Sequence, residues 1–247
     1  MTHQYTDLMI DRRCNEEDSH MTTVQFIREI QPHTNYEITI EDLVPTDKPI
    51  TIKLMAPEDR DAPGILIDID WKKSEHAKSD NMIDDSNANI LGGSKLHILK
   101  SDISIPLIEE QHLHYYGAQL YELGDIIQFT ALLPLFKMTI GKNYVKHYIM
   151  KYTHGVYIET HDRPHLHIPS SPNSSGYIVL GRHVGTQVKL GAFKIPYGKA
   201  LYTRDNIIHN DCFLVGDYYV IYSKTQHYST LVFVDTDNKP ISVAIGW

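Results

Sequence analysis

The sequence contains two His-x-His pairs, His112-Leu113-His114 and His165-Leu166-His167, whose imidazoles could bind a metal ion. The secondary structure of each pair decides whether it can. On a strand, residues two apart share a face and both rings can reach one ion, whereas on a helix they diverge. The second pair follows residues 156–161, a run with strand character, so it is the pair that we expect to supply ligands.

The residues before the second pair extend the same pattern. Glu159 and His161 have the same parity as His165 and His167, so an extended chain points all four side chains to one side. Neutral imidazole binds Fe, Zn or Ni, and a carboxylate can complete such a site. We predict that His165 and His167 are metal ligands, with Glu159 and His161 as candidates for a further position. The open alternative is a polar loop, because 15 histidines in 247 residues produce His-x-His by chance.

Another ligand must come from elsewhere in the chain, because two side chains rarely hold a divalent metal. His209 is the best candidate, since it comes directly before a strongly apolar, aromatic run. A side chain at that place can point into the mouth of a barrel. The alternative is a turn histidine between Asn206 and Asn210.

Tyrosines are numerous in this part of the chain, and they include Tyr202, Tyr218 and Tyr222. Their rings can line a pocket while their hydroxyls bind a polar substrate. The candidate catalytic residues are therefore Tyr202 and Glu159, with Glu159 as a general base or a fourth ligand. Aromatic core packing is the open alternative for the tyrosines.

The first His-x-His pair lies in the best helical pattern of the chain. Apolar residues from Leu113 to Leu123 recur at steps of three and four, Pro106 can start a helix, and Gly124 can end it. We predict a helix over residues 106–124. Both histidines of this pair are then surface residues rather than ligands.

Most of the remaining chain consists of short alternating or apolar runs separated by Pro, Gly or Asp. Such runs, rich in β-branched and aromatic residues, predict strands. They cover residues 36–40, 50–55, 65–71, 156–161, 177–180, 187–195, 213–222, 230–235 and 241–245. The pattern predicts a mainly β fold, an antiparallel β-barrel or sandwich with extra N-terminal strands and one or two helices.

The chain divides into four expected segments. We predict an N-terminal tail at 1–22, an N-terminal β segment packing on the barrel at 23–71, a polar loop or insert at 72–95, and the helix with the barrel at 96–247. The third segment is rich in Asn and Ser and lacks periodicity, which is typical of a surface loop or a disordered insert.

Composition and charge argue against several classes of function. A formal net charge of −8 disfavours a broad nucleic-acid surface or an anionic-membrane binder. No apolar run has the length of a membrane span, and no secretory signal is evident, so a cytoplasmic location is the expectation. Two cysteines cannot build a disulfide framework, and neither a P-loop nor a Gly-x-Ser-x-Gly motif occurs.

The C-terminal half, roughly residues 150–235, resembles the cupin superfamily. His165-Leu166-His167 matches the His-x-His of that family's first motif, and a glycine-bounded run at 176–181 follows it. Pro196-Tyr197-Gly198 matches the Pro-x-Gly turn of its second motif, and His209-Asn210 comes after it. The sequence departs from the family pattern in two places. Ser171-Pro172 replaces the glutamate after His-x-His, and Leu201 takes the usual place of the second motif's histidine.

The resemblance implies a cupin-like double-stranded β-helix with one divalent metal in the mouth of its barrel. It further implies a metal-dependent enzyme acting on a small polar metabolite. Fe(II) is favoured over Zn or Ni, which makes a mononuclear-iron dioxygenase the first expectation. A cupin-type isomerase or epimerase and a non-catalytic sugar- or metabolite-binding β domain are the alternatives. The expected partners are a small-molecule substrate and, through exposed strand edges, a second copy of the chain in a homodimer, with no nucleic acid and no membrane.

Overall fold

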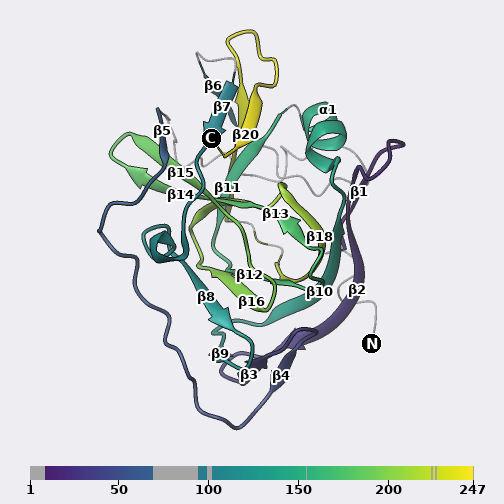
Figure 1. The fold of residues 1–247 in the computed structure, drawn as a ribbon, viewed down its shortest axis with the longest axis vertical. Coiled ribbons are helices and arrows are strands. Elements are labelled where there is room, and N and C mark those ends of the chain that lie inside the picture. Colours follow the sequence, from purple (N-terminus) through teal and green to yellow (C-terminus); the bar gives the residue numbers. More distant parts are fainter. Residues whose placement is uncertain are drawn as a thin grey trace.

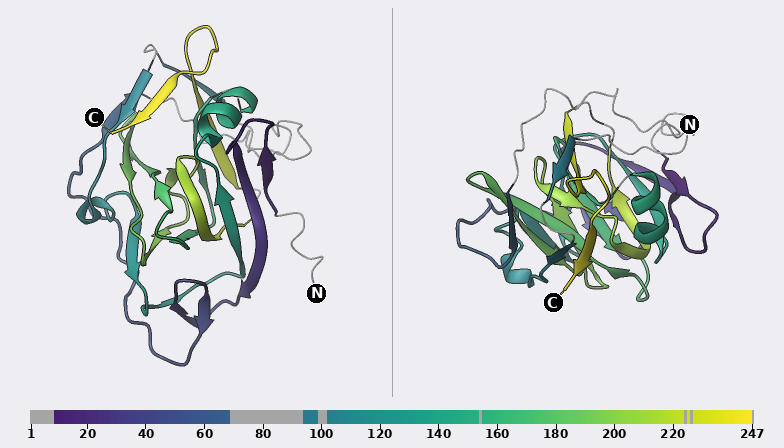
Figure 2. Two further views of the ribbon diagram at one scale, coloured as in Figure 1. Left: turned by 45° about the vertical axis from the view of Figure 1, so that its right-hand side comes forward. Right: turned by 90° about the horizontal axis from the view of Figure 1, so that it is seen from above.

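The computed structural model describes residues 9–68, 94–98, 102–153, 155–223, 225 and 227–246. The described chain is mainly β, as expected, and its strands form two large curved sheets with two smaller ones (Figure 1). The two large sheets lie around a common interior (Figure 2).

The first large sheet is antiparallel and contains both N-terminal and C-terminal strands. Its order is β1 (Asp11–Arg13), β2 (His20–Ile30), β10 (Leu133–Ile140), β18 (Leu214–Ile221), β12 (His165–Pro169), β16 (Lys199–Thr203) and β8 (Ala118–Glu122), and β13 (Ser175–Gly176) also pairs with β18.

The second large sheet faces the first. Its order is β5 (Ile65–Asp68), β15 (Gln187–Phe193), β14 (Ile178–Val184), β17 (Ile208–Asn210), β11 (Tyr157–His161), β19 (Tyr228–Val234) and β6 (Ser94–His97), and only the β19–β6 pair is parallel. From β10 to β19 the chain changes sheet repeatedly, since β10, β12, β16 and β18 belong to the first sheet and β11, β14, β15, β17 and β19 to the second, with β14 and β15 as a consecutive pair. The chain therefore crosses the interior repeatedly, which places residues from distant positions side by side.

The first sheet is covered on both faces at β12, which explains why β12 is buried at every position. Its inner face packs on the second sheet through residues such as Leu201 and Val220. Its outer face packs through Leu166 and Tyr202 against a three-stranded sheet of β4 (Leu43–Pro45), β3 (Asn35–Ile38) and β9 (Ile126–Gln128). Because side chains alternate along a strand, β12 points its leucine outward and its histidines inward.

The helix predicted over residues 106–124 is wrong. The structure has a 3₁₀ turn at Glu110–His112, followed by β8, which pairs with β16. Gly117 adopts a left-handed backbone conformation, with φ of 75°, and thereby ends the turn before the strand begins. Of the apolar residues at helical spacing, Leu113 and Tyr116 are buried around the turn, whereas Leu123, just after the strand, is exposed.

A helical segment lies elsewhere, at a π-helical turn Tyr144–Ile149 that continues into α1 (Met150–Tyr152). Tyr144, Tyr148 and Tyr152 follow one another at steps of four, and their rings form a stack with centroid separations of 5.4 and 5.0 Å. This spacing in the sequence was the available signal for the helix, and it was missed.

Other expectations for the N-terminal half also need correction. Residues 50–55 form no strand, and most of their side chains are exposed. The backbone there is held by side chains, as where Met55 N–H donates to Gln119 Oε1 at 3.0 Å, rather than by a partner strand. The boundary of the expected tail at residue 22 falls inside β2, so residues 11–13 and 20–22 belong to the first sheet.

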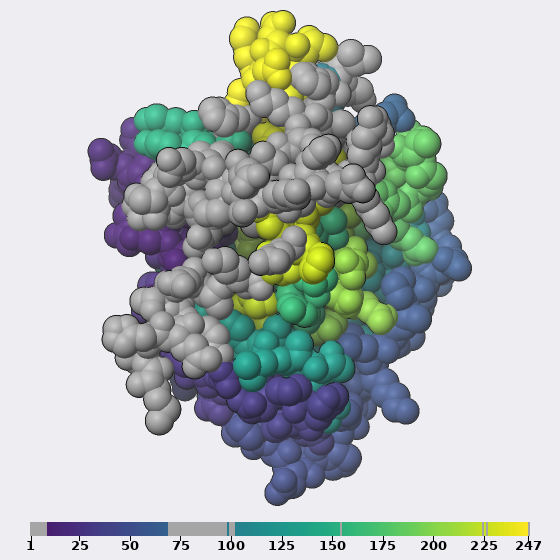
Figure 3. All heavy atoms as spheres, turned by 180° about the vertical axis from the view of Figure 1, so that it is seen from behind, coloured from purple at the N-terminus to yellow at the C-terminus, as the bar shows by residue number. Residues whose placement is uncertain are grey.

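The expected insert at 72–95 lies outside the described residues except for its last two positions, which begin β6. The remaining elements are β7 (Asp102–Ile105) and β20 (Ser242–Ile245), which pair in parallel. Figure 3 shows the face opposite to Figure 1, with N-terminal residues in purple and blue at the lower end and C-terminal residues in yellow at the top. None of the helices in the described part of the chain has the length and apolarity needed to cross a membrane.

Candidate metal centre

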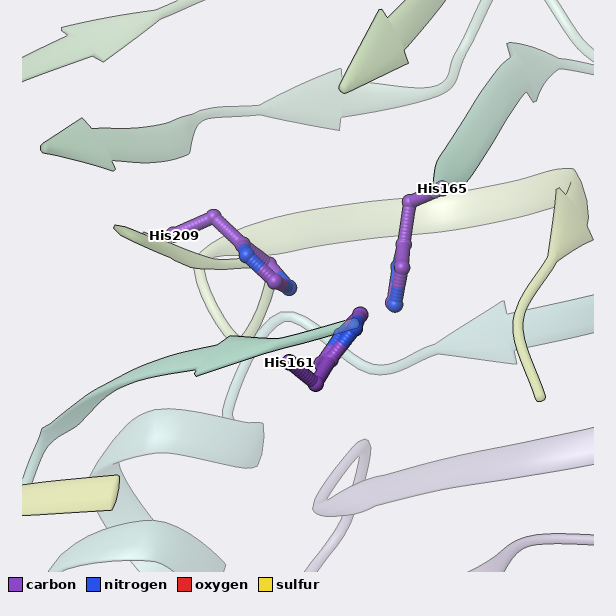
Figure 4. Close-up of side chains that lie close together, drawn as sticks. All are labelled: His161, His165 and His209. Carbon is purple, nitrogen blue, oxygen red and sulfur yellow. The ribbon is translucent and has the colours of Figure 1, made fainter. Parts of the chain in front are cut away.

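Three strands place histidines at one position in the interior. His161 ends β11 and His165 begins β12, so the short turn between them carries the chain from one large sheet to the other. His209 lies on β17, directly opposite Glu159 of β11 in the register. The three imidazoles come from both sheets and point toward one another (Figure 4).

The donor atoms of His161, His165 and His209 all lie within 4.8 Å of one another. The His161 and His165 rings stack with centroids 4.6 Å apart. The His209 ring lies 4.8 Å from the first and 4.7 Å from the second. Three imidazoles at this separation could hold a metal ion.

A second group, His165, His167 and Asp211, meets the same distance limit. Asp211 follows the end of β17, and its Oδ2 lies 3.7 Å from His167 Nε2. Asp211 is not among the ligands that the sequence predicts. The available signal was its parity with His209, two residues earlier, which puts both on one side of an extended chain.

Several ring nitrogens in this cluster have no hydrogen-bond partner although they are buried. His209 Nδ1 is 2.9 Å from the Ile207 carbonyl oxygen, and because a carbonyl only accepts, Nδ1 must carry the proton. Its Nε2 therefore carries no proton and has a lone pair available to accept. This atom is buried without a hydrogen-bond partner, as are His165 Nδ1 and both ring nitrogens of His167. Leaving such groups unsatisfied is costly, and a bound cation would satisfy them.

Two carboxylates accompany the histidines at similar distances. Glu159 Oε1 is 3.8 Å from His209 Nε2, and Asp211 Oδ2 is 3.7 Å from His167 Nε2. Both separations are too long for a hydrogen bond. Two ligands of one tetrahedral zinc, each about 2.1 Å from the ion, lie about 3.4 Å apart, so these spacings are closer to those of shared ligands.

Burial keeps the imidazoles neutral, which is the form that binds a metal. It lowers the pKa of His161 to about 3, with a further contribution from His209. It also lowers the pKa of His165 well below the ordinary value, assisted by the neighbouring histidines, and it lowers the pKa of His209.

The two carboxyl groups differ in their protonation. Burial, together with the charge of Asp211, raises the pKa of Glu159 to about 8. Burial also acts to raise the pKa of Asp211, but His167, His209 and Arg12 together lower it below its ordinary value. The centre therefore combines one ionised carboxylate with one carboxyl group that can exchange a proton near neutral pH.

The structure does not bring Tyr202 to this cluster. Tyr202 lies opposite Leu166 in the register and shares its outward face. Its ring contacts those of Tyr121 and Phe129, with centroids 6.5 and 6.2 Å away. We therefore assign Tyr202 to packing and not to catalysis.

The histidines of the other His-x-His pair lie apart from the cluster. His112 is in the 3₁₀ turn, and His114 Nδ1 is 3.7 Å from Glu58 Oε1. Within the described residues, neither belongs to a group with metal-binding spacing. The helix on which we based the interpretation of this pair as surface residues is absent, so that interpretation stays a prediction.

Comparison with protein-family models, curated proteins and solved structures found no match to this chain.

Proposed function

We propose that this protein is a metal-dependent enzyme of cupin type that acts on a small polar metabolite. The observation that carries the proposal is the convergence of three neutral imidazoles, from His161, His165 and His209, on one buried position. Buried polar atoms in proteins usually have a hydrogen-bond partner, so unpartnered ring nitrogens that gather inside a core indicate a bound ligand. A divalent ion there would supply Lewis-acid activation or a place for dioxygen beside an organic substrate.

The proposed metal site is buried, and the little exposure that it has lies at two of its three histidines. His161 and His165 keep 6% and 7% of their surface exposed, while His209 keeps 1%. A small molecule would therefore approach along the edge formed by the first two rings. Thr203 lies opposite His165 and Thr230 opposite Glu159 in the register, and both hydroxyls are buried without a partner among the described residues. These hydroxyls would bind polar groups of the substrate.

Glu159 would serve as the acid–base group of the reaction. Its carboxyl group lies beside His209, and its pKa of about 8 lets it hold or release a proton near neutral pH. A general acid or base works best when its pKa is close to the working pH. This carboxyl group replaces, in function, the glutamate that is missing after His-x-His.

The leading reaction is a dioxygenase reaction with mononuclear Fe(II), since three imidazoles leave further positions of an iron ion open. The second candidate is proton transfer in an isomerase or epimerase, and the raised pKa of Glu159 specifically favours it. The alternation of strands between two sheets supports the cupin-type arrangement. A homodimer through the exposed sheet edges is part of the proposal, because such edges favour strand pairing.

Metal analysis of the untagged protein tests the proposal. Protein expressed with added iron under anaerobic conditions should contain bound metal, His165→Ala should lose it, and His161→Ala should lose the ion that His161 and His209 hold. His112→Ala is the matched control and should retain it. Dioxygen consumption with candidate substrates then separates the two reactions, because proton transfer consumes none. A wild-type protein without metal, whatever metal is supplied, would overturn the proposal and favour a metabolite-binding domain.

A further inference from the structure

His165 belongs to both groups of candidate ligands. One group adds His161 and His209, and the other adds His167 and Asp211. Donors bound to one ion at about 2.1 Å lie no more than about 4.2 Å apart. The five side chains form two groups rather than one at a limit of 4.8 Å, so a single ion cannot bind all of them.

The second group is not explained by an ion in the first. His167 is 1% exposed, and neither of its ring nitrogens has a hydrogen-bond partner. Its nearest carboxylate, that of Asp211, lies 3.7 Å away, beyond hydrogen-bond distance. A buried imidazole with both nitrogens unsatisfied, beside a carboxylate that does not bond it, is suited to a cation that binds both.

We propose that the interior binds a second divalent cation between His167 and Asp211, beside the first, with His165 between the two ions. The proposal rests on the proposed function, because the first ion, which His161 and His209 hold, would remain the single iron of that reaction and the second cation would be an addition beside it. Each half of the cluster has its own pair of an imidazole and a carboxyl group, His209 with Glu159 and His167 with Asp211. The two pairs have almost the same separation, 3.8 and 3.7 Å.

His165 can serve both ions only if each ring nitrogen binds one. Its Nδ1 is buried and has no hydrogen bond that would keep a proton there. Binding of the second ion then releases the remaining ring proton to solvent and leaves an imidazolate between the ions. The Asp211 carboxylate and this imidazolate supply negative charge against the two dications.

The second ion should bind more weakly than the first. Arg12 is 7% exposed, and its guanidinium donates to Tyr144 Oη at 3.4 Å. Its positive charge contributes to the lowered pKa of Asp211. In a poorly hydrated interior, this positive charge opposes a second dication. The structure therefore predicts two binding steps rather than one.

Cobalt titration of the metal-free protein tests the inference. Co²⁺ is added to untagged protein after chelator dialysis, and binding is followed by visible absorption and by metal analysis after gel filtration. The wild type should bind two equivalents in two steps. His167→Ala and Asp211→Asn should keep only the tighter step, His161→Ala should lose it, and His165→Ala should lose both.

Asp211→Asn preserves side-chain shape and keeps the test valid if His167→Ala does not fold, which circular dichroism shows. His112→Ala should retain both equivalents. A second equivalent that disappears in this control would be adventitious surface binding, and one that persists in both His167→Ala and Asp211→Asn would place the ion elsewhere. Either result overturns the inference, as does saturation of the wild type at one equivalent. No binding at all overturns the proposed function as well.

Discussion

Glu159 and His209 lie directly opposite each other on β11 and β17, with Oε1 and Nε2 3.8 Å apart. Burial raises the pKa of Glu159 to about 8, so its carboxyl group is protonated at neutral pH. Burial lowers the pKa of His209, so its imidazole is neutral. A protonated acid beside an unprotonated base, with no hydrogen bond between them, is an arrangement that a ligand or metal ion can complete.

Replacement of Glu159 by Gln should flatten the pH dependence of stability in the metal-free protein. The pKa of Glu159 rises on folding from 4.5 to about 8, so its contribution to stability falls as pH rises through this range. The lowered pKa of His161 instead makes stability rise with pH, but only up to pH 6.5, the pKa of this group in the unfolded chain. Between pH 6.5 and 8, the wild type should therefore lose about 2 kcal/mol more unfolding free energy than Glu159→Gln. Urea unfolding at several pH values measures this, and parallel pH profiles would contradict the assignment.

Asn210 should act as a positioning residue for the centre. Its side-chain amide donates to the Tyr157 carbonyl oxygen and accepts from Cys212 N–H at 2.7 Å, so it connects β17 to β11 between His209 and Asp211. Asn210→Ala should weaken metal affinity by about tenfold to a hundredfold. Competition with a metal-binding dye measures the affinity. Asn173→Ala, at an exposed turn position, is the control, and an equal loss in both variants would argue against positioning.

Leu166→Ala should destabilise the fold while leaving the metal ligands in place. Leu166 lies between the two histidines of β12 but is fully buried in the outer cluster, on the face opposite to theirs. Removing its side chain should lower the free energy of unfolding by about 2–5 kcal/mol. Leu123→Ala, at a side chain 39% exposed, should change it by about 0.5 kcal/mol or less. Loss of metal stoichiometry in a folded Leu166→Ala protein would contradict the alternation of faces.

Gly176→Ala should be more destabilising than Gly185→Ala, although both glycines have positive φ, of 82° and 60°. A side chain at Gly176 would overlap the carbonyl of Phe213, where β13 pairs with β18. At Gly185, a side chain would meet nothing, so only backbone strain of about 1–2 kcal/mol is expected. Thermal unfolding compares the two variants, and equal losses would show that the close approach at β13 is relieved by a small movement.

The sequence alone determined those features that depend on local periodicity. Alternation predicted strands at residues 156–161 and 187–195, and the structure has β11 and β15 there. Parity within one strand also relates Glu159 to His161 on β11 and His165 to His167 on β12, but the turn between the two strands carries the chain to the other sheet, so the convergence of the two pairs does not follow from one extended chain. The inferences within single strands succeed because side-chain direction in a strand follows from the backbone itself.

Pairing between distant strands decided what the local pattern left ambiguous. Residues 113–123 have helical spacing, yet residues 118–122 are a strand because β16 provides a partner. Tyr202 lies near the candidate ligands in the sequence but belongs to the other face of β16. Likewise, Asp211 and His167 become neighbours only because β17 and β12 belong to different sheets that face each other. Sequence spacing describes one strand at a time, whereas a site between two sheets depends on which strands the chain places opposite one another, and long-range packing decides that.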